Sequence, residues 1–216
     1  MQIIEKNFYL PGKTLQFQVV ADIESLVTDL SDEDKVPCWA DVWPAAEGLA
    51  RYIWDRIDFT GQDVLELGSG LGLPGVVGGL KGGRITFSDF QEDALRLSLH
   101  NARLNGVVQA EALQEDWRFF KCDRKFHWII GSDILYEPRL NPYLGNIMRE
   151  YLLPGGGLLI SHPGRKQTFD FLQAWFDPLY FSEERDLVAI VVDDPLLPYQ
   201  SITVHKFSYI NDESNL

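Results

Sequence analysis

The stretch ELGSGLGLPG, residues 66–75, decides the fold of this chain. It contains four glycines and overlaps the end of the short apolar run DVLEL at residues 63–67. A glycine-rich loop after a buried strand is typical of nucleotide-binding α/β folds, because glycine lets the backbone approach a ligand closely. Three glycines, at 70, 72 and 75, fit the G-x-G-x-x-G spacing of dinucleotide sites, but an acid, Glu66, precedes the loop.

Around this loop, strand-like and helix-like segments alternate. We expect strands at 63–67, 84–89, 111–116, 126–133 and 158–162, and helices at 73–81, 91–105, 140–151 and 166–176. This alternation predicts a doubly wound α/β fold, in which a mostly parallel sheet is covered by helices on both faces. Two further strands, at 187–193 and 201–209, predict an antiparallel pair at one edge of the sheet.

The N-terminal part has a different pattern. Residues 2–10 and 14–21 indicate a β-hairpin around Pro11-Gly12, and a helix through Arg56 follows, with Pro44 in its first turn. At 216 residues the chain fits a single domain. We expect residues 1–60 to form a hairpin-and-helix extension and residues 61–216 to form the cofactor-binding core.

Charge and composition exclude several classes of function. The 19 basic and 32 acidic residues give a net charge of −13, which disfavours binding to a nucleic-acid backbone. The two cysteines and four histidines match no zinc-ligand spacing, so no metal is expected. The N-terminus does not resemble a signal peptide, and no apolar run is long enough to cross a bilayer. We therefore expect a cytoplasmic protein with no membrane partner.

An acid stands at the end of each of the first four predicted core strands. These acids are Glu66, Asp89, Asp116 and Asp133. Because the carboxyl ends of parallel strands meet at one edge of a doubly wound sheet, all four are expected around one crevice. Trp117 directly follows the third strand and Tyr136 lies just beyond the fourth, so aromatic side chains are expected there too.

These residue types indicate the class of ligand. Asp89, about 20 residues beyond the glycine loop, suits the hydroxyls of a ribose. Trp117 offers a flat face to a purine, and Asp116 can accept a hydrogen bond from its amine. A pyrophosphate prefers a site without a neighbouring acid, so Glu66 argues against a dinucleotide and favours a nucleoside that carries positive charge. S-adenosylmethionine fits this description, whereas a nicotinamide-dependent oxidoreductase is disfavoured.

Several motifs together resemble the class I, seven-strand S-adenosylmethionine-dependent methyltransferases, whose fold is Rossmann-like. The chain is most similar to the branch that contains nicotinamide N-methyltransferase-like and protein-lysine methyltransferases. The matching stretches are WADVWPAAEGLARYI (39–53), VLELGSGLGLPG (64–75), FSDF (87–90), EDW (115–117), GSDILYEP (131–138) and LLPGGGLLISHPGR (152–165).

The resemblance implies a role for individual residues. Glu66, Gly68 and Gly70 would hold the methionine end of the cofactor, and Asp89 would bind its ribose. The other cofactor contacts implied at the strand ends and in the N-terminal helix are Trp43, Ser69, Phe90, Asp116, Trp117 and Ser132. Asp133 and Tyr136, in the D-x-x-Y signature, would face the methyl group and the substrate as catalytic residues. No metal is implied, and S-adenosylhomocysteine would be the product.

The implied activity is direct, in-line methylation of a lysine side chain in a protein. Two alternatives stay open: a small amine or heteroaromatic nitrogen as substrate, and a module that binds S-adenosylmethionine without catalysis. His162 and Arg165 follow the strand at 158–162 and can line the same crevice, although a buried, hydrogen-bonded histidine explains His162 equally well. The partner is therefore a protein with an accessible lysine, or a small amine.

Overall fold

The central sheet sets the architecture. Within residues 1–27, 37–192, 196 and 198–210, which this computed structural model describes, seven strands pair in the order β5-β4-β3-β6-β7-β9-β8. Their bounds are β3 Asp63–Leu67, β4 Arg84–Asp89, β5 Ala110–Gln114, β6 Phe126–Ser132, β7 Leu152–His162, β8 Phe181–Val191 and β9 Tyr199–Tyr209. The first five are parallel, whereas β9 pairs antiparallel with both β7 and β8. The predicted fold class is confirmed.

Strand order locates the ligand crevice. The chain runs outward from β3 through β4 to β5, and then crosses back so that β6 lies on the other side of β3. In a doubly wound sheet, ligands bind at the carboxyl ends of the strands that flank such a reversal. The ends of β3, β4 and β6 are therefore expected to form the site.

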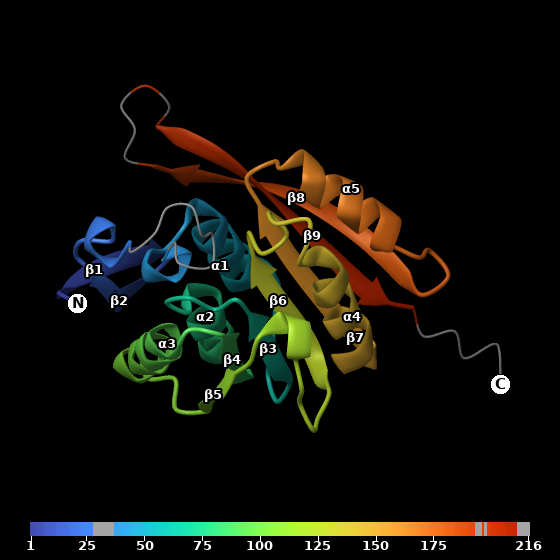
Figure 1. Ribbon diagram of the computed structural model, residues 1–216, viewed down its shortest axis with the longest axis horizontal. Helices are drawn as coiled ribbons and strands as arrows, with labels where there is room; N and C mark the ends of the chain where they lie inside the picture. Colours follow the sequence, from blue (N-terminus) through green and yellow to red (C-terminus); the bar gives the residue numbers. More distant parts are fainter. Residues whose placement is uncertain (28–36, 193–195, 197, 211–216) are drawn as a thin grey trace.

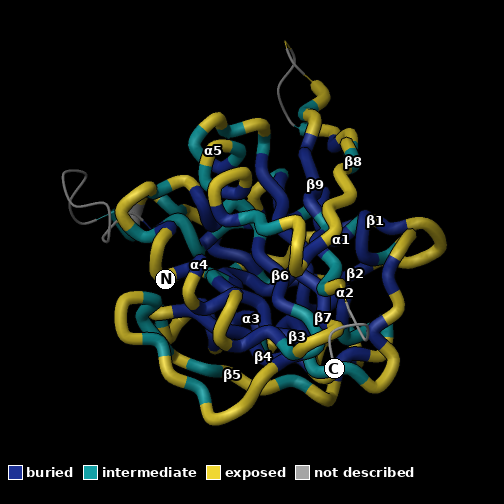
Figure 2. The backbone as a smooth tube through the Cα atoms, turned by 90° about the vertical axis from the view of Figure 1, so that its right-hand side faces the viewer, coloured by how far each residue is buried: buried dark blue, intermediate teal, exposed yellow. Residues whose placement is uncertain are grey.

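Helices cover both faces of the sheet (Figure 1). They are α1 Pro44–Arg56, α2 Leu73–Leu80 and α3 Glu92–Leu104 on one face, and α4 Asn141–Tyr151 and α5 Lys166–Trp175 on the other. Successive residues of β3 point into opposite cores: Val64 joins the cluster with α1–α3, and Leu65 joins the cluster with α4 and α5. Figure 2 shows the buried residues concentrated in these central strands and the exposed ones in the outer turns.

The N-terminal hairpin, β1 Ile3–Leu10 and β2 Lys13–Val20, forms a separate two-stranded sheet, as predicted. Asn101 of α3 and Asn105, the residue that caps the end of α3, hold its edge as a neighbouring strand would. Asn101 accepts from Gln18 N at 2.8 Å, and Asn105 accepts from Gln16 N at 3.0 Å. Asn101 also donates to the backbone oxygen of Leu71 at 3.1 Å, which ties the hairpin to the glycine loop.

Two strands differ from the sequence-based expectation. β8 begins at Phe181, six residues before the predicted start. The sequence does not reveal this part of the strand, because residues 182–185 are exposed, mostly charged and without an apolar pattern. β7 begins at Leu152 and contains the Pro-Gly-Gly-Gly run that was expected to be a turn. The register against β6 shifts there, and a Cβ on Gly157 would clash with the indole of Trp128. No helix of the described residues is long and apolar enough to span a membrane.

Candidate active site

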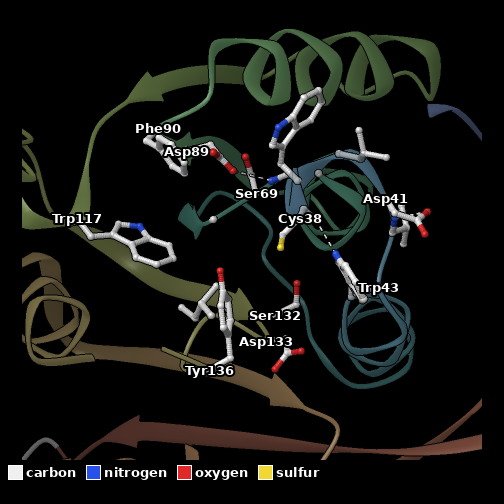
Figure 3. Close-up of a pocket in the computed structure, with 18 of the residues that line it drawn as sticks. Cys38, Asp41, Trp43, Ser69, Asp89, Phe90, Trp117, Ser132, Asp133 and Tyr136 are labelled. Carbon is white, nitrogen blue, oxygen red and sulfur yellow. Dashed lines mark hydrogen bonds between the residues drawn. The ribbon is translucent and has the colours of Figure 1, made fainter. Parts of the chain in front are cut away.

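A cavity of about 240 Å³ lies at the carboxyl ends of β3, β4 and β6 (Figure 3). The glycine loop, the start of α1, the segment after β5 and the segment after β6 all contribute to its lining. The predicted site residues that line it are Trp43, Gly68, Ser69, Gly70, Asp89, Phe90, Asp116, Trp117, Ser132, Asp133 and Tyr136. Residues that are far apart in the sequence thus meet around one cavity. Among the predicted site residues, Glu66 alone does not line it.

The glycine loop presents its backbone to the cavity. Gly68 and Gly70 have φ values of 60° and 49°, a left-handed conformation that side chains disfavour. A Cβ on Gly68 would lie 3.0 Å from both the ring of Trp117 and the side chain of Ile134. Glycine at position 68 therefore leaves open the space between the loop and Trp117.

Asp89, at the end of β4, is held by backbone amides on both oxygens. Its Oδ2 accepts from Gly70 N at 3.0 Å and its Oδ1 accepts from Gln91 N at 3.0 Å. Burial raises the pKa of Asp89, and the amide donors of Gln91, Gly70 and Phe90 act in the opposite direction. The carboxylate is thus fixed in direction, and its remaining lone pairs can bind a ligand in the cavity that it lines.

Glu66 is not among the residues that line the cavity, and its contact with the cofactor stays a prediction. Its side chain is 1% exposed and accepts a hydrogen bond from Gly75 N, at the start of α2, at 3.0 Å. Burial raises its pKa well above the ordinary value, although the Gly75 amide lowers it; Asp89 raises it further. A Cβ on Gly75 would clash with this carboxyl. Glu66 therefore supports the loop from behind.

The charges of the cavity lining disfavour a pyrophosphate. The lining contains five acids, Asp41, Asp89, Glu115, Asp116 and Asp133, and two arginines, Arg118 and Arg165. Each arginine is paired with an acid, Arg118 with Asp116 and Arg165 with Asp133. The lining thus carries a net negative charge, which favours a cationic ligand and disfavours a doubly charged phosphate.

Asp116 and Trp117 begin the short helix η4 Trp117–Phe119. Asp116 caps this helix by accepting from Arg118 N at 2.9 Å, and the Arg118 guanidinium lowers the pKa of Asp116. Both carboxylate oxygens therefore have a protein partner that the sequence did not reveal. The contact of Asp116 with an adenine amine stays a prediction, as does the contact of Trp117, which lines the cavity, with the adenine ring.

Trp43 precedes the first turn of α1 and is half exposed at the cavity. Its Nε1 donates to the backbone oxygen of Cys38 at 2.6 Å, which fixes the indole beside the cavity (Figure 3). The helix that carries it is tied to the sheet, because Ser161 Oγ donates to Ala45 O at 2.8 Å. Phe90 is also half exposed and lines the cavity next to Asp89.

Asp133 follows β6 in a left-handed conformation, with a φ of 51°, alone among the non-glycine residues that the structure describes. Its N–H donates to Ser161 O at 2.7 Å. Arg165 donates to it twice, Nε to Oδ1 and Nη2 to Oδ2, each at 2.7 Å. Strain of this kind is often found at functional sites, and a bidentate pair fixes the carboxylate in direction.

Arg165 is a central residue that the predicted site set lacks. It stands three residues beyond β7, the strand parallel and adjacent to β6, so the run HPGR at 162–165 was the available signal. Tyr136, which is 43% exposed, extends its ring toward the space between Trp117 and Cys38 (Figure 3). Asp133, Arg165 and Tyr136 thus form one side of the cavity, and the glycine loop with Asp89 forms the other.

The sequence of this chain is similar to that of a known protein family and of several individual proteins. Residues 23–175 match a protein family described as lysine methyltransferase. The histidine protein methyltransferase 1 homolog of Dictyostelium discoideum is 32% identical over 122 residues, which is 53% of this chain and 40% of that protein. EEF1A lysine methyltransferase 3 of Xenopus tropicalis is 29% identical over 151 residues, 67% of each chain. The match thus spans less than half of the Dictyostelium relative.

Solved structures share the fold. The T. thermophilus 16S rRNA N2 G1207 methyltransferase, solved with AdoMet and guanosine, has a TM-score of 0.65 at 15% identity. That similarity covers 96% of this chain and 50% of the solved chain. At this level of identity the similarity establishes the architecture: a doubly wound sheet of the kind seen in methyltransferases.

Proposed function

This chain belongs to the lysine methyltransferase family, and we propose that it transfers a methyl group from S-adenosylmethionine to the side-chain amine of a lysine in a protein. One observation carries the proposal. The ends of three neighbouring strands bring the glycine loop, Asp89 and the Asp133–Tyr136 motif to a single cavity with an acidic lining. A cationic nucleoside and a nucleophilic amine can therefore meet there.

The residues present fit S-adenosylmethionine. The backbone at Gly68 and Gly70 leaves a cradle that a Cβ would narrow, and Asp89 directs a fixed carboxylate toward it. Ser69 Oγ is buried beside the cavity without a hydrogen-bond partner among the described residues, as expected for a group whose partner is a ligand. We propose that Asp89 binds the ribose, that Trp117 and Phe90 face the adenine, and that the glycine loop holds the methionine end.

The cofactor supplies a methyl group already activated by a sulfonium, so the protein need only position and desolvate the nucleophile. A lysine amine attacks only in its neutral form. A bare carboxylate would stabilise the ammonium, but the Arg165 guanidinium offsets the charge of Asp133. We propose that Asp133 and the Tyr136 hydroxyl orient the amine by hydrogen bonds, and that its proton leaves to solvent.

We propose a lysine in a protein as the substrate because the matching family is described as lysine methyltransferase. The names of the relatives indicate that the target residue differs among them, since one is called a histidine protein methyltransferase and another a lysine methyltransferase. A small amine stays the main alternative. The half-exposed rings of Trp43 and Tyr136 border the cavity and can contact the alkyl part of an inserted lysine.

The proposal is tested by incubating the purified chain with methyl-labelled S-adenosylmethionine and a proteome lysate of the source organism. We expect label in a small number of proteins and, after hydrolysis, in methyllysine. Asp133→Ala should abolish the signal, and Asp170→Ala, an exposed acid on α5, should leave it unchanged. Label confined to small molecules, to histidine or arginine, or found in no product at all would each overturn the lysine assignment.

A second measurement separates the cofactor classes. We expect S-adenosylmethionine and S-adenosylhomocysteine to raise the melting temperature of the chain, and NAD to have no effect. A rise with NAD alone would contradict the proposed cofactor and favour an oxidoreductase.

A further inference from the structure

We propose that His162, His205 and Glu183 form a buried positioning chain that holds Arg165 in place on Asp133. None of the three lines the cavity. They connect the outer strands β8 and β9 to the site by a continuous series of hydrogen bonds. The importance of this series for catalysis rests on the proposed role of Asp133. The hydrogen bonds themselves do not depend on that role.

The hydrogen bonds follow one another from the site to the edge of the sheet. Arg165 N donates to His162 Nδ1 at 3.0 Å, and His162 Nε2 lies 3.0 Å from His205 Nε2. His205 Nδ1 lies 2.7 Å from Glu183 Oε1. At the other end, the Arg165 side chain binds both oxygens of Asp133 at 2.7 Å. Four residues thus connect the edge strand β8 to the carboxylate.

These partners determine the protonation of both rings. Because the Arg165 amide donates to His162 Nδ1, that nitrogen carries no proton, and the neutral ring carries its proton on Nε2. His162 Nε2–H therefore donates to His205 Nε2, which places the His205 proton on Nδ1, facing Glu183. Every donor then has an acceptor, and the sequence of donors runs in one direction from Arg165 to the carboxylate of Glu183.

The surroundings disfavour the charged form of both rings. His162 and His205 are fully buried, with ring planes 17° apart and Phe169 packed edge-on against both. Burial, aided by His205, Arg185 and Arg165, lowers the pKa of His162 to about 4. Burial also lowers the pKa of His205 and outweighs the opposite effect of Glu183. The unprotonated Nδ1 of His162 is therefore available to the Arg165 amide at neutral pH.

The positioning chain matters because it binds the backbone N–H of Arg165. The backbone oxygen of Arg165, at the N-cap of α5, accepts from Thr168 N and Phe169 N, each at 3.2 Å, and His162 accepts from the N–H at 3.0 Å. It follows Gly164, which has a φ of 86°, in the short turn between β7 and α5. The arginine side chain has many rotamers, and holding it in one geometry is entropically unfavourable. A fixed amide at its base reduces the freedom of the guanidinium and so helps to keep Asp133 directed into the cavity.

The first test needs no substitution in the chain of hydrogen bonds. Nitrogen-15 NMR of histidine-labelled protein reports which ring nitrogen carries the proton, and His100→Gln and His127→Gln assign the other two histidines. We expect His162 as the Nε2–H form and His205 as the Nδ1–H form, and we expect His162 not to titrate between pH 5.5 and 8, because its pKa is lowered to about 4. The opposite form of His162, or titration of His162 near pH 6.5, would overturn the proposal.

The second test asks whether the positioning chain acts on catalysis through Arg165. His205→Leu removes the acceptor for His162 Nε2–H, and His205→Gln keeps an amide oxygen that can replace it. Loss of one hydrogen bond should speed hydrogen exchange at Arg165 Nε and lower kcat by about tenfold in His205→Leu, with KM for the cofactor changed less than twofold. His205→Gln should restore both quantities to within about threefold of wild type.

A matched control removes the effect of general destabilisation. Ile202→Ala, on the same strand β9, empties a fully buried position that packs against α1 and makes no polar link to Arg165. We expect it to lower the melting temperature while leaving Arg165 Nε exchange and kcat near wild type. If Ile202→Ala and His205→Leu change Arg165 Nε exchange and kcat equally, the positioning chain only stabilises the fold, and its positioning role is overturned.

The two proposals fail in different ways. If the wild-type protein methylates no lysine, the proposed function fails, but the protonation of His162 and the exchange at Arg165 still decide the positioning chain. If methylation occurs and Arg165 exchange does not respond to His205→Leu, the positioning chain alone fails.

Discussion

Asp89 and Asp133 stand in the same cavity at the ends of two strands, yet they are held by different means. Asp89 is held by backbone amides, one from the adjacent glycine loop and one two residues further along the chain. Asp133 is held by the guanidinium of Arg165, 32 residues away, with two buried histidines behind it. Asp89 is thus fixed by main-chain donors, one of them 19 residues away, whereas Asp133 is fixed by a side-chain pair. We therefore propose that the cofactor half of the site depends on backbone geometry and the substrate half on side-chain pairing.

The largest effect is expected on the substrate half. Asp133→Ala should lower methyl transfer by about 100-fold or more, because a misplaced nucleophile loses most of the benefit of positioning. The affinity for S-adenosylmethionine should change less than about threefold, since Asp133 lies on the other side of the cavity. Steady-state kinetics and calorimetry measure the two quantities. Equal losses in both would remove the distinction between the halves.

The converse effect is expected on the cofactor half. Asp89→Asn keeps an oxygen for the Gly70 amide but loses a charge-assisted hydrogen bond to the ribose, so Kd should rise by about 30-fold. At saturating cofactor, kcat should fall less than about threefold. A kcat that stays low at saturation would show that Asp89 also acts in the chemical step.

Substituting two glycines with similar φ values distinguishes the effect of backbone strain from the effect of filling the cavity. Gly68 and Gly61 have φ values of 60° and 72°, but a Cβ meets Trp117 and Ile134 at Gly68 and nothing within 4 Å at Gly61. Both Gly→Ala changes should destabilise the fold by about 1 kcal/mol. Gly68→Ala should also weaken cofactor binding by about tenfold, or about 1.4 kcal/mol. Equal cofactor affinity in the two variants would contradict the proposed cradle.

The smallest effect is expected at Glu66, behind the loop. Glu66→Gln keeps an acceptor for the Gly75 amide, so Kd for the cofactor should change less than about twofold. Because burial raises the pKa of Glu66 in the folded protein, the folded state binds a proton more readily than the unfolded chain. Wild type should therefore gain stability relative to Glu66→Gln as the pH falls from neutrality toward 5. A large rise in Kd would restore Glu66 to the binding site.

Elements with a buried apolar pattern could be predicted from the sequence. The strand DVLEL and the helix of α3 were located to within about one residue, because their alternation and periodicity reflect burial. The first half of β8 could not be located, since an edge strand exposed to solvent carries charges in place of an apolar pattern. The Pro-Gly-Gly-Gly run suggested a turn, whereas the Trp128 ring occupies the space that side chains would need.

In the candidate site, too, some features could be predicted from the sequence and others could not. Residues such as Asp89 and Trp117 could be placed at the cavity because the end of a strand fixes where they lie. The position of the Glu66 side chain behind the loop could not be predicted, because its direction depends on the pleat of β3 and on the amide of Gly75. Arg165 could be expected at the crevice, but its pairing with Asp133 and that of Arg118 with Asp116 could not be predicted, since side-chain pairing leaves no periodic pattern in the sequence.

A crystal structure of the chain with S-adenosylhomocysteine tests the central claim most directly. The account predicts that the ribose hydroxyls bind Asp89, that the adenine lies beside Trp117, and that the sulfur faces Asp133 and Tyr136 with the Arg165 pair intact. A ligand bound with its ribose at Asp133, or outside the cavity between the glycine loop and Tyr136, would contradict it.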